Sequence, residues 1–141
     1  RNLQMLVVVR DALSNVDLSH LIYVSSDAVY ADSDGPLTET SSTAPESLHG
    51  IMHLAREISL RGIAGSAPFA IVRPTLIYGA DDPHNGYGPN YFIRNAQKNK
   101  DIKIFGNGEE RRDHIHVDNI ADITKNIIIK IKLVIKIVVV V

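Results

Sequence analysis

Two histidines, His49 and His53, have the types and spacing that most directly indicate chemistry in this sequence. An interval of four residues places both imidazole rings on one face of a helix, one turn apart. Imidazole gains and loses a proton near neutral pH, so the pair is suited to acid/base work. The same interval is typical of zinc-binding helices, but no Glu follows His49 and no third ligand is evident, so we expect no metal. Structural histidines are the remaining interpretation.

The stretch around the two histidines has the features of an amphipathic helix. Pro45 suits the first turn of a helix, and Glu46 suits the positive end of its dipole. Gly62 is the expected C-terminal cap. The apolar residues recur at helical intervals and are Leu48, Ile51, Met52, Ala55 and Ile58. The pattern therefore predicts a helix with one apolar face.

Two short apolar runs flank this helix, and each run ends in small polar residues. Residues 21–24 precede Ser-Ser-Asp at 25–27, and residues 69–72 precede Arg-Pro-Thr at 73–75. Such runs are typical of buried parallel strands. The order strand, helix, strand predicts an α/β fold with a parallel sheet. Ligands of such sheets bind beyond the carboxyl ends of the strands, so the two strand ends and the histidine helix should meet at one crevice.

The composition excludes several classes of protein. The chain has 141 residues, of which 45% are hydrophobic and 22% charged, with a net charge of −1. This balance fits one modest globular domain and argues against nucleic acid as the main partner, because phosphate binding needs a basic surface. The chain has no cysteine, which excludes disulfides and thiolate sites and fits a reducing compartment such as the cytoplasm. The first residues lack the pattern of a signal peptide.

The segments after the second strand continue the alternation of elements. Residues 79–90 predict a turn-rich loop, and residues 91–98 predict a short helix. Residues 102–105 and 114–117 predict two further short strands. Asp118 is the expected cap of a last helix.

The two ends of the chain are apolar. Residues 2–13 are rich in Val, and their pattern does not decide between helix and strand. Residues 127–141 consist of Ile, Leu, Val and Lys alone, a segment too short and too interrupted by Lys for a membrane span. The alternation over residues 129–132 predicts a strand with one wet face. We therefore divide the chain into residues 1–123 and an unusual tail, residues 124–141, to which no function is assigned.

Four segments in order resemble the extended short-chain dehydrogenase/reductase family, which contains the NAD-dependent sugar-nucleotide epimerases and dehydratases. Pro45, Gly50 and Glu57 stand where that family has a proline, the glycine of Tyr-Gly-x-x-Lys, and a glutamate. The other three segments are Tyr-Val-Ser-Ser-Asp-Ala-Val-Tyr at 23–30, Val-Arg-Pro-Thr-Leu-Ile-Tyr-Gly at 72–79, and Phe-Gly-Asn-Gly at 105–108 followed by Arg-Asp-His-Ile-His-Val-Asp at 112–118.

The resemblance implies a doubly wound parallel sheet of the Rossmann type, seen in part. The sequence lacks the glycine-loop βαβ unit with which the family binds the dinucleotide's pyrophosphate, so the choice between NAD and NADP is not indicated. A second departure lies on the histidine helix. His49 stands at the position of the family's catalytic tyrosine, and His53 stands at the position of its lysine.

The family's chemistry implies a role for each matched position. There, a tyrosine moves a proton to or from a sugar hydroxyl while hydride passes to or from nicotinamide, and a lysine holds the nicotinamide ribose. Carried over by position, Ser26 is the hydroxyl that shares the substrate's hydrogen bond, His49 the acid/base and His53 the ribose contact. The cofactor-binding positions implied are Ser25, His53, Pro74 and Thr75.

On the substrate side, the resemblance implies four residues. Arg112 matches the arginine that meets the substrate's diphosphate, a task suited to its fork of donors. Phe105 matches a position near the nucleotide base, and Asn90 one near its sugar and phosphate. Asp27 matches the first residue of the Asp-Glu pair of 4,6-dehydratases, but Ala28 stands at the glutamate position. Epimerase or reductase chemistry is therefore preferred over dehydration.

The prediction from sequence is an NAD- or NADP-dependent sugar-nucleotide epimerase or related reductase, with His-x-x-x-His in place of Tyr-x-x-x-Lys. Its predicted partner is a nucleotide sugar, with no nucleic acid and no membrane, and the resemblance implies a homodimer in the cytoplasm. The alternative is a family member without catalysis, which keeps the crevice and uses it to bind a nucleotide or a sugar nucleotide.

Overall fold

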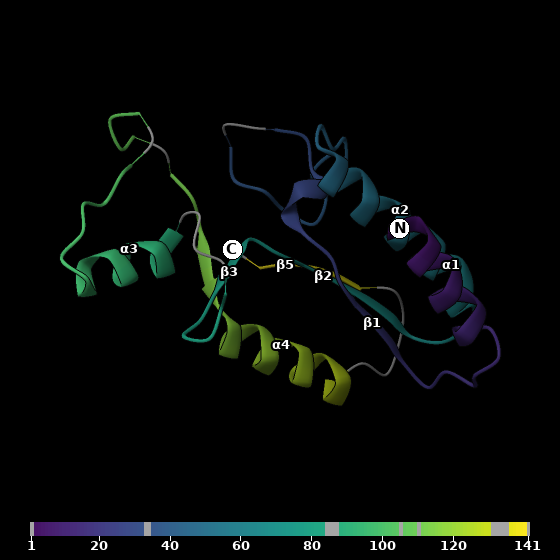
Figure 1. Cartoon of the computed structure of the whole chain (residues 1–141). Coiled ribbons are helices and arrows are strands. Elements are labelled where there is room, and N and C mark those ends of the chain that lie inside the picture. The colour runs from purple at the N-terminus through teal and green to yellow at the C-terminus, as the bar shows by residue number, and fades with distance from the viewer. Residues whose placement is uncertain are drawn as a thin grey trace.

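A computed structural model of the chain describes residues 2–32, 35–83, 88–104, 106–109 and 111–130, and the backbone of 136–140. Helices and strands alternate along most of these residues (Figure 1). The elements in chain order are α1 (Asn2–Leu13), β1 (Leu21–Val24), the 3-10 turn η1 (Asp27–Val29), α2 (Leu48–Ala64), β2 (Phe69–Pro74), β3 (Leu76–Tyr78), α3 (Gly88–Gln97), β4 (His114–His116), α4 (Val117–Lys130) and β5 (Lys136–Val140).

The strands form two parallel sheets. The larger sheet has the order β1-β2-β5, and the smaller one pairs β3 with β4. Helix α2 is the crossover from β1 to β2, whose register pairs Leu21 with Phe69 and Val24 with Val72. This arrangement confirms the predicted α/β fold with parallel strands.

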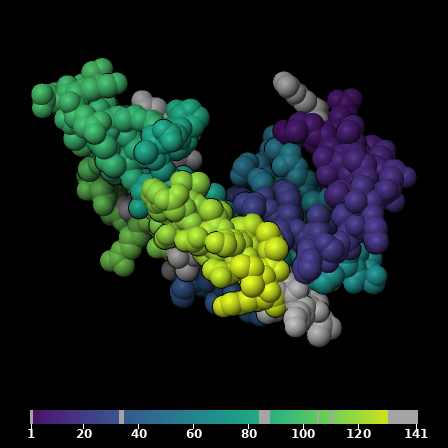
Figure 2. Space-filling model, turned by 90° about the horizontal axis from the view of Figure 1, so that it is seen from below, coloured from purple at the N-terminus to yellow at the C-terminus, as the bar shows by residue number. Residues whose placement is uncertain are grey.

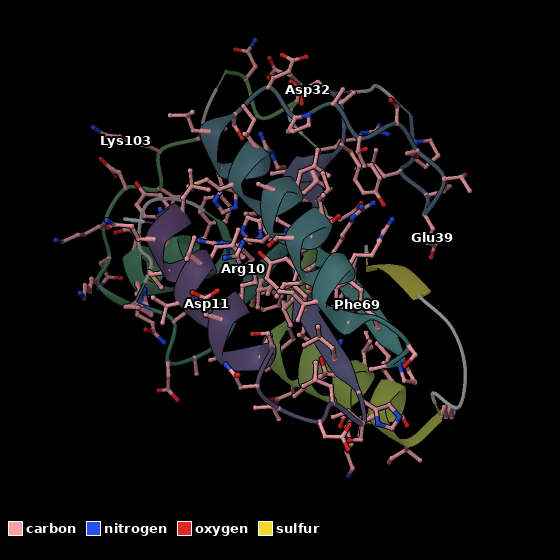
Figure 3. The ribbon with its side chains drawn as sticks, turned by 90° about the vertical axis from the view of Figure 1, so that its right-hand side faces the viewer. Arg10, Asp11, Asp32, Glu39, Phe69 and Lys103 are labelled. Carbon is pink, nitrogen blue, oxygen red and sulfur yellow. The ribbon has the colours of Figure 1, made fainter. Side chains whose placement is uncertain are left out.

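Helices cover both faces of the larger sheet, as Figures 1 and 3 show for α1 and α2 on one side and α4 on the other. On the first face, Phe69 and Ile71 of β2 pack with Leu60 and Ala64 of α2. On the other face, Val72 packs with residues of β4 and α4. Successive side chains of a strand point to opposite faces, so the fully buried β2 supplies both cores. The doubly wound arrangement predicted from the sequence is therefore confirmed.

The ends of α2 differ from those expected. The helix begins after Ser47, whose hydroxyl accepts a hydrogen bond from the Gly50 N–H at 3.0 Å, so Pro45 precedes the helix. The C-terminal cap is Gly65 rather than Gly62, which lies inside the helix. Gly65 has a φ of 55°, a value that glycine adopts without the steric cost of a side chain.

Other predicted elements also shift. Residues 2–13 form a helix, and Asp118 lies in the first turn of α4 rather than at its cap. The strand predicted for 129–132 is wrong for Ile129 and Lys130, which belong to α4, because the apolar residues before them recur at helical intervals and pack on β2. Residues 102–104 form no strand, since none of the described strands pairs with them.

Helix α4 runs across the predicted boundary at residue 123, and β5 adds to the larger sheet beside β2. The division at residue 123 stays a prediction. None of the helices in the described part of the chain combines the length and the apolarity needed to cross a bilayer.

Candidate active site

Ser25 and Ser26, which follow β1, form hydrogen bonds to the sheet and within the turn that comes next. The Ser25 N–H donates to the Val72 carbonyl at 2.7 Å, which prolongs the pairing with β2. The Ser26 hydroxyl accepts from the Ala28 N–H at 3.1 Å and so caps η1. The same hydroxyl lies 3.1 Å from a carboxylate oxygen of Asp27. Ser26 and Asp27 are therefore held together at the carboxyl end of β1, where the sequence places them.

Helix α2 approaches this turn closely because Gly50 has no side chain. A Cβ built on Gly50 lies 1.9 Å from the Ala28 carbonyl oxygen and 2.7 Å from the Pro45 side chain, distances that real atoms do not reach. The glycine thus brings the first turns of α2 against η1. His49 and His53, which flank it in sequence, are carried to the same strand end.

The two histidines and a tyrosine of β1 form a chain of contacts, which we call the histidine cluster. The Tyr23 hydroxyl and His53 Nδ1 are 2.8 Å apart. The rings of His53 and His49 meet edge to face, with centroids 4.6 Å apart. His53 is half-buried, whereas His49 is exposed. The predicted pairing of the imidazoles on one helix face is confirmed, while Tyr23 was not expected from the sequence.

Burial favours the neutral form of two members of the histidine cluster. Burial lowers the pKa of His53, and the positive charges that His49 and Arg56 can carry lower it further. Burial also raises the pKa of the Tyr23 hydroxyl, against the opposing effect of the nearby positive charge of Arg56. A neutral imidazole beside a protonated phenol can share a hydrogen bond without carrying charge into the core.

One turn beyond His53, a second polar group forms what we call the buried ion-pair cluster. Arg73 of β2 binds Glu57 through two hydrogen bonds, from Nε at 2.9 Å and from Nη2 at 2.6 Å. The Ser25 hydroxyl donates to the same carboxylate at 2.6 Å. All three residues are at least 95% buried, and the guanidinium also lies 4.8 Å from the centre of the Tyr30 ring.

Sequence reasoning missed the buried ion-pair cluster, although a signal was present. Arg73 is a charge at the end of an otherwise apolar strand, and Glu57 lies on the helix that precedes this strand. A buried charge needs a partner of opposite sign, so the two residues could have been paired. Ser25, predicted to contact a cofactor, uses its hydroxyl for Glu57 in this structure.

At the end of β2, Pro74 is buried and Thr75 reaches towards the segment before β4. The Thr75 hydroxyl donates to the Asp113 carbonyl at 2.9 Å. Arg112, the neighbouring residue, is exposed, and its carbonyl lies 3.0 Å from Nδ1 of His114. The strand end and the predicted diphosphate-binding segment are therefore adjacent.

A cavity of about 130 Å³ lies between β3, α3 and β4 and is lined by Tyr78, Asn90 and His114 among others. Asn90 is 8% exposed, and its amide donates to the Asp82 carboxylate at 2.8 Å. Arg94 donates to the Asp82 carbonyl. The predicted substrate residue Asn90 thus lines a cavity of mixed polar and apolar character, whereas Phe105 lies outside the described residues.

The predicted site residues fall into two groups. One lies around β1, η1 and the start of α2, and the other lies around β3, α3 and β4. Figure 2 shows α3, in green, apart from α1 and β1, in purple and blue, with α4 in front. Within the described ranges, no group of three His, Cys, Asp or Glu side chains is placed to hold a metal ion. The roles of these residues stay predictions.

The chain matches the model of a known protein family over residues 1–137, and that family is described as the NAD dependent epimerase/dehydratase family. Among curated proteins, it is 26% identical over 121 residues to an uncharacterized UDP-glucose epimerase, YtcB, of Bacillus subtilis (strain 168). That match covers 84% of this chain and 38% of the relative.

Solved structures share the fold. UDP-glucuronic acid 4-epimerase of Bacillus cereus, in complex with UDP-glucuronic acid and NAD, superposes with a TM-score of 0.83 at 21% identity, over 99% of this chain and 45% of that one. UDP-N-acetylglucosamine 4-epimerase of Methanobrevibacter ruminantium M1, in complex with UDP-N-acetylmuramic acid, superposes with a TM-score of 0.84 at 23% identity. The superposition covers 99% of this chain and 46% of that one. The chain therefore spans less than half the length of these relatives.

Proposed function

Because the chain belongs to the NAD-dependent epimerase/dehydratase family, we propose that it contributes the acid/base helix and part of the substrate site of a sugar-nucleotide epimerase that uses NAD. The observation that carries the proposal is the position of His49 and His53. They lie on the crossover helix α2, whose first turns Gly50 brings against the carboxyl end of β1. Ligands of parallel sheets bind at this edge.

In this proposal His49 transfers the proton. Its ring is exposed, so a sugar hydroxyl can reach it. An imidazole can accept and return a proton in acid/base catalysis without a lysine beside it. Ser26 stands next to the helix and supplies a hydroxyl that can turn from Asp27 to the substrate. NAD, when bound, would supply the hydride acceptor and donor for the sugar carbon.

The residues present fit the nicotinamide end of NAD. His53 uses Nδ1 for Tyr23, which leaves Nε2 as the ring atom for a ribose hydroxyl. Pro74, the last residue of β2, and Thr75 after it lie at the same sheet edge as the end of β1. The pyrophosphate requires other parts of the protein, because no glycine loop occurs in these 141 residues.

The nucleotide sugar would extend towards the second group of residues. Asn90 lines the cavity between β3 and α3, and Arg112 offers an exposed guanidinium near the end of β2. Amide and guanidinium donors suit the oxygens of a diphosphate. Asp27, Asn90 and Arg112 are therefore the proposed substrate contacts, with Phe105 added from the sequence.

The direct test replaces His49 with Ala in the full protein and measures epimerisation of UDP- and dTDP-sugars. Loss of an acid/base group lowers the turnover rate by about 10²- to 10⁴-fold. His20→Ala is the control, because His20 precedes β1 at the opposite edge of the sheet. Unchanged turnover in His49→Ala contradicts the assigned role.

The second candidate is a binding protein that has lost catalysis. The observation that favours it is the absence of both tyrosine and lysine at positions 49 and 53. Nicotinamide absorbance and fluorescence of the purified full protein separate the two candidates. Bound cofactor whose spectrum no sugar nucleotide changes supports the binding protein, and failure to bind any nicotinamide cofactor contradicts both.

A homodimer through α1 and α2 is also proposed. These helices expose large apolar side chains, among them Val8 at 68% and Ile58 at 66%. Contiguous exposed apolar surface is typical of protein interfaces. Ultracentrifugation should show a dimer that Ile58→Lys dissociates and that Ile129→Lys, at an equally exposed position on α4 (65%), leaves intact. A monomeric full protein contradicts the proposed homodimer.

The absence of cysteine keeps the cytoplasm as the proposed location.

A further inference from the structure

The hydrogen bond between Tyr23 and His53 joins a core strand to the proposed cofactor contact. The two atoms, Tyr23 Oη and His53 Nδ1, are 2.8 Å apart. We propose that Tyr23 is a positioning residue that holds His53 in the tautomer with its proton on Nε2, so that this N–H donates to the ribose of a bound dinucleotide. The inference rests on the proposed function, which gives His53 its ribose contact.

The direction of the hydrogen bond follows from the two groups that share it. The unprotonated nitrogen of a neutral imidazole is a stronger acceptor than a phenol oxygen, and a phenol O–H is a good donor. The phenol proton therefore lies towards His53 Nδ1. A neutral imidazole that accepts at Nδ1 carries its proton on Nε2.

The protonation states support the same direction. Burial raises the pKa of Tyr23, so the phenol keeps its proton at neutral pH. Burial lowers the pKa of His53, with His49 and Arg56 acting in the same sense and the Glu57 carboxylate in the opposite one. The His53 ring is therefore neutral and carries a single N–H, which can lie on either Nδ1 or Nε2.

The position of Tyr23 is fixed by the core, so its hydroxyl can orient the His53 ring. Its backbone pairs in register with Ile71 of the fully buried β2. Its ring packs against the core formed by Leu60, Ala64, Phe69 and Ile71. A side chain on a helix surface commonly changes rotamer, whereas a hydroxyl fixed by a core strand holds the imidazole in one orientation. A lysine needs no such orientation, because all its protons are donors.

The first measurement is the tautomer of His53 in the full protein, read from long-range ¹H–¹⁵N correlations of the imidazole nitrogens. The His53 signals are assigned by their loss in His53→Gln. We expect an unprotonated Nδ1 and a protonated Nε2 in the unaltered protein, and a mixture of both tautomers in Tyr23→Phe. A protonated Nδ1 in the unaltered protein, or the same tautomer in Tyr23→Phe, overturns the inference.

The second measurement is the affinity for NAD, by titration calorimetry on the same proteins. One oriented hydrogen bond contributes about 0.5–1.5 kcal/mol, so Tyr23→Phe should raise the dissociation constant about 2- to 12-fold. Tyr91→Phe removes a hydroxyl from α3 and should change neither the tautomer nor the affinity. Tyr23→Phe keeps its ring in the core, so its melting temperature checks that the protein still folds.

The outcomes separate the role of Tyr23 from the proposed function. NAD affinity that Tyr23→Phe retains unchanged overturns the role of Tyr23 and leaves the proposed function standing. No binding of NAD by the unaltered full protein contradicts the proposed function, and this inference falls with it even where the tautomer is the expected one. A weakened affinity with a changed tautomer supports both.

Discussion

Helix α2 carries two polar clusters one turn apart, and they are built in opposite ways. In the buried ion-pair cluster, Glu57 is 2% exposed and receives hydrogen bonds from both Arg73 and Ser25. In the histidine cluster, the half-buried His53 has one hydrogen bond, to Tyr23, and its ring touches the exposed His49. Both clusters connect α2 to β1.

The difference follows from the cost of burying charge. An ionised carboxylate inside a protein is stable only when its oxygens are paired, so Glu57 has its capacity taken up by the protein itself. A neutral histidine needs only one partner, so a nitrogen remains for a ligand. The buried cluster is therefore expected to serve stability, and the histidine cluster to serve binding and catalysis.

The largest effect is expected from Glu57→Gln. This change leaves the Arg73 charge buried without its counter-ion, which should lower the free energy of unfolding by about 3–5 kcal/mol. Urea unfolding followed by circular dichroism measures it. The exposed pair of Arg10 and Asp11 is the control, because its side chains are 51% and 63% exposed and Arg10→Ala should cost at most about 1 kcal/mol.

A double variant sharpens this result. Replacing Glu57 and Arg73 together with Leu and Met removes both charges, and such replacements are often neutral for stability. Stability close to that of the unaltered protein would show that the single variant suffers from an unpaired charge. A loss below about 1 kcal/mol in Glu57→Gln would contradict the structural role of the cluster.

A smaller effect is expected from Gly50→Ala, at the junction of α2 with η1. The new methyl group would meet the Ala28 carbonyl at 1.9 Å, so the helix has to shift, at a cost of about 1–3 kcal/mol in stability. Gly62→Ala on the same helix has no atom within 4 Å and should stabilise by about 0.5–1 kcal/mol. Equal effects in the two variants would refute the close approach that positions His49 and His53.

The smallest effect is the pH dependence contributed by the histidine cluster. The pKa of His53 is lower in the folded protein than its ordinary value of about 6.5 in an unfolded chain. As the pH falls through that value, the unfolded chain binds a proton that the folded protein excludes, so stability decreases until the pH reaches the lower, folded pKa. Above about pH 7 the contribution vanishes.

His53→Gln removes this contribution, so its stability should decrease less steeply than that of the unaltered protein between about pH 7 and pH 5. The groups facing His53 are His49, Arg56 and Glu57 on α2 and Tyr23 on β1, and all of them remain in the variant. Urea midpoints measured across this range give the two slopes. Parallel pH curves would mean that His53 is solvated like an ordinary surface histidine.

Much of the fold could be predicted because its signals are local. The apolar runs at 21–24 and 69–72 lie in β1 and β2, and the apolar spacing after residue 47 gave α2. Element boundaries were less accurate. The C-terminal cap of α2 was predicted at Gly62 but lies at Gly65, because cap geometry depends on where the last turn can end against the following strand.

The tail shows where local patterns mislead. Residues 129 and 130 alternate as in a strand but continue α4, whose Ile120, Ile123 and Ile127 pack around Val72. The strand of this region begins only at Lys136 and pairs with β2. Short apolar runs suit either element, and the surrounding core decides between them.

The sequence by itself determined the strand, helix, strand order of β1, α2 and β2 and the placing of two imidazoles on one helix face, since both depend on the period of side chains along the chain. Only the tertiary structure decided which partner each polar side chain has. Tyr23 meets His53 across 30 residues and Glu57 meets Arg73 across 16, because the crossover lays α2 over β1 and β2. Contacts between residues far apart in sequence arise from packing, which no local pattern records.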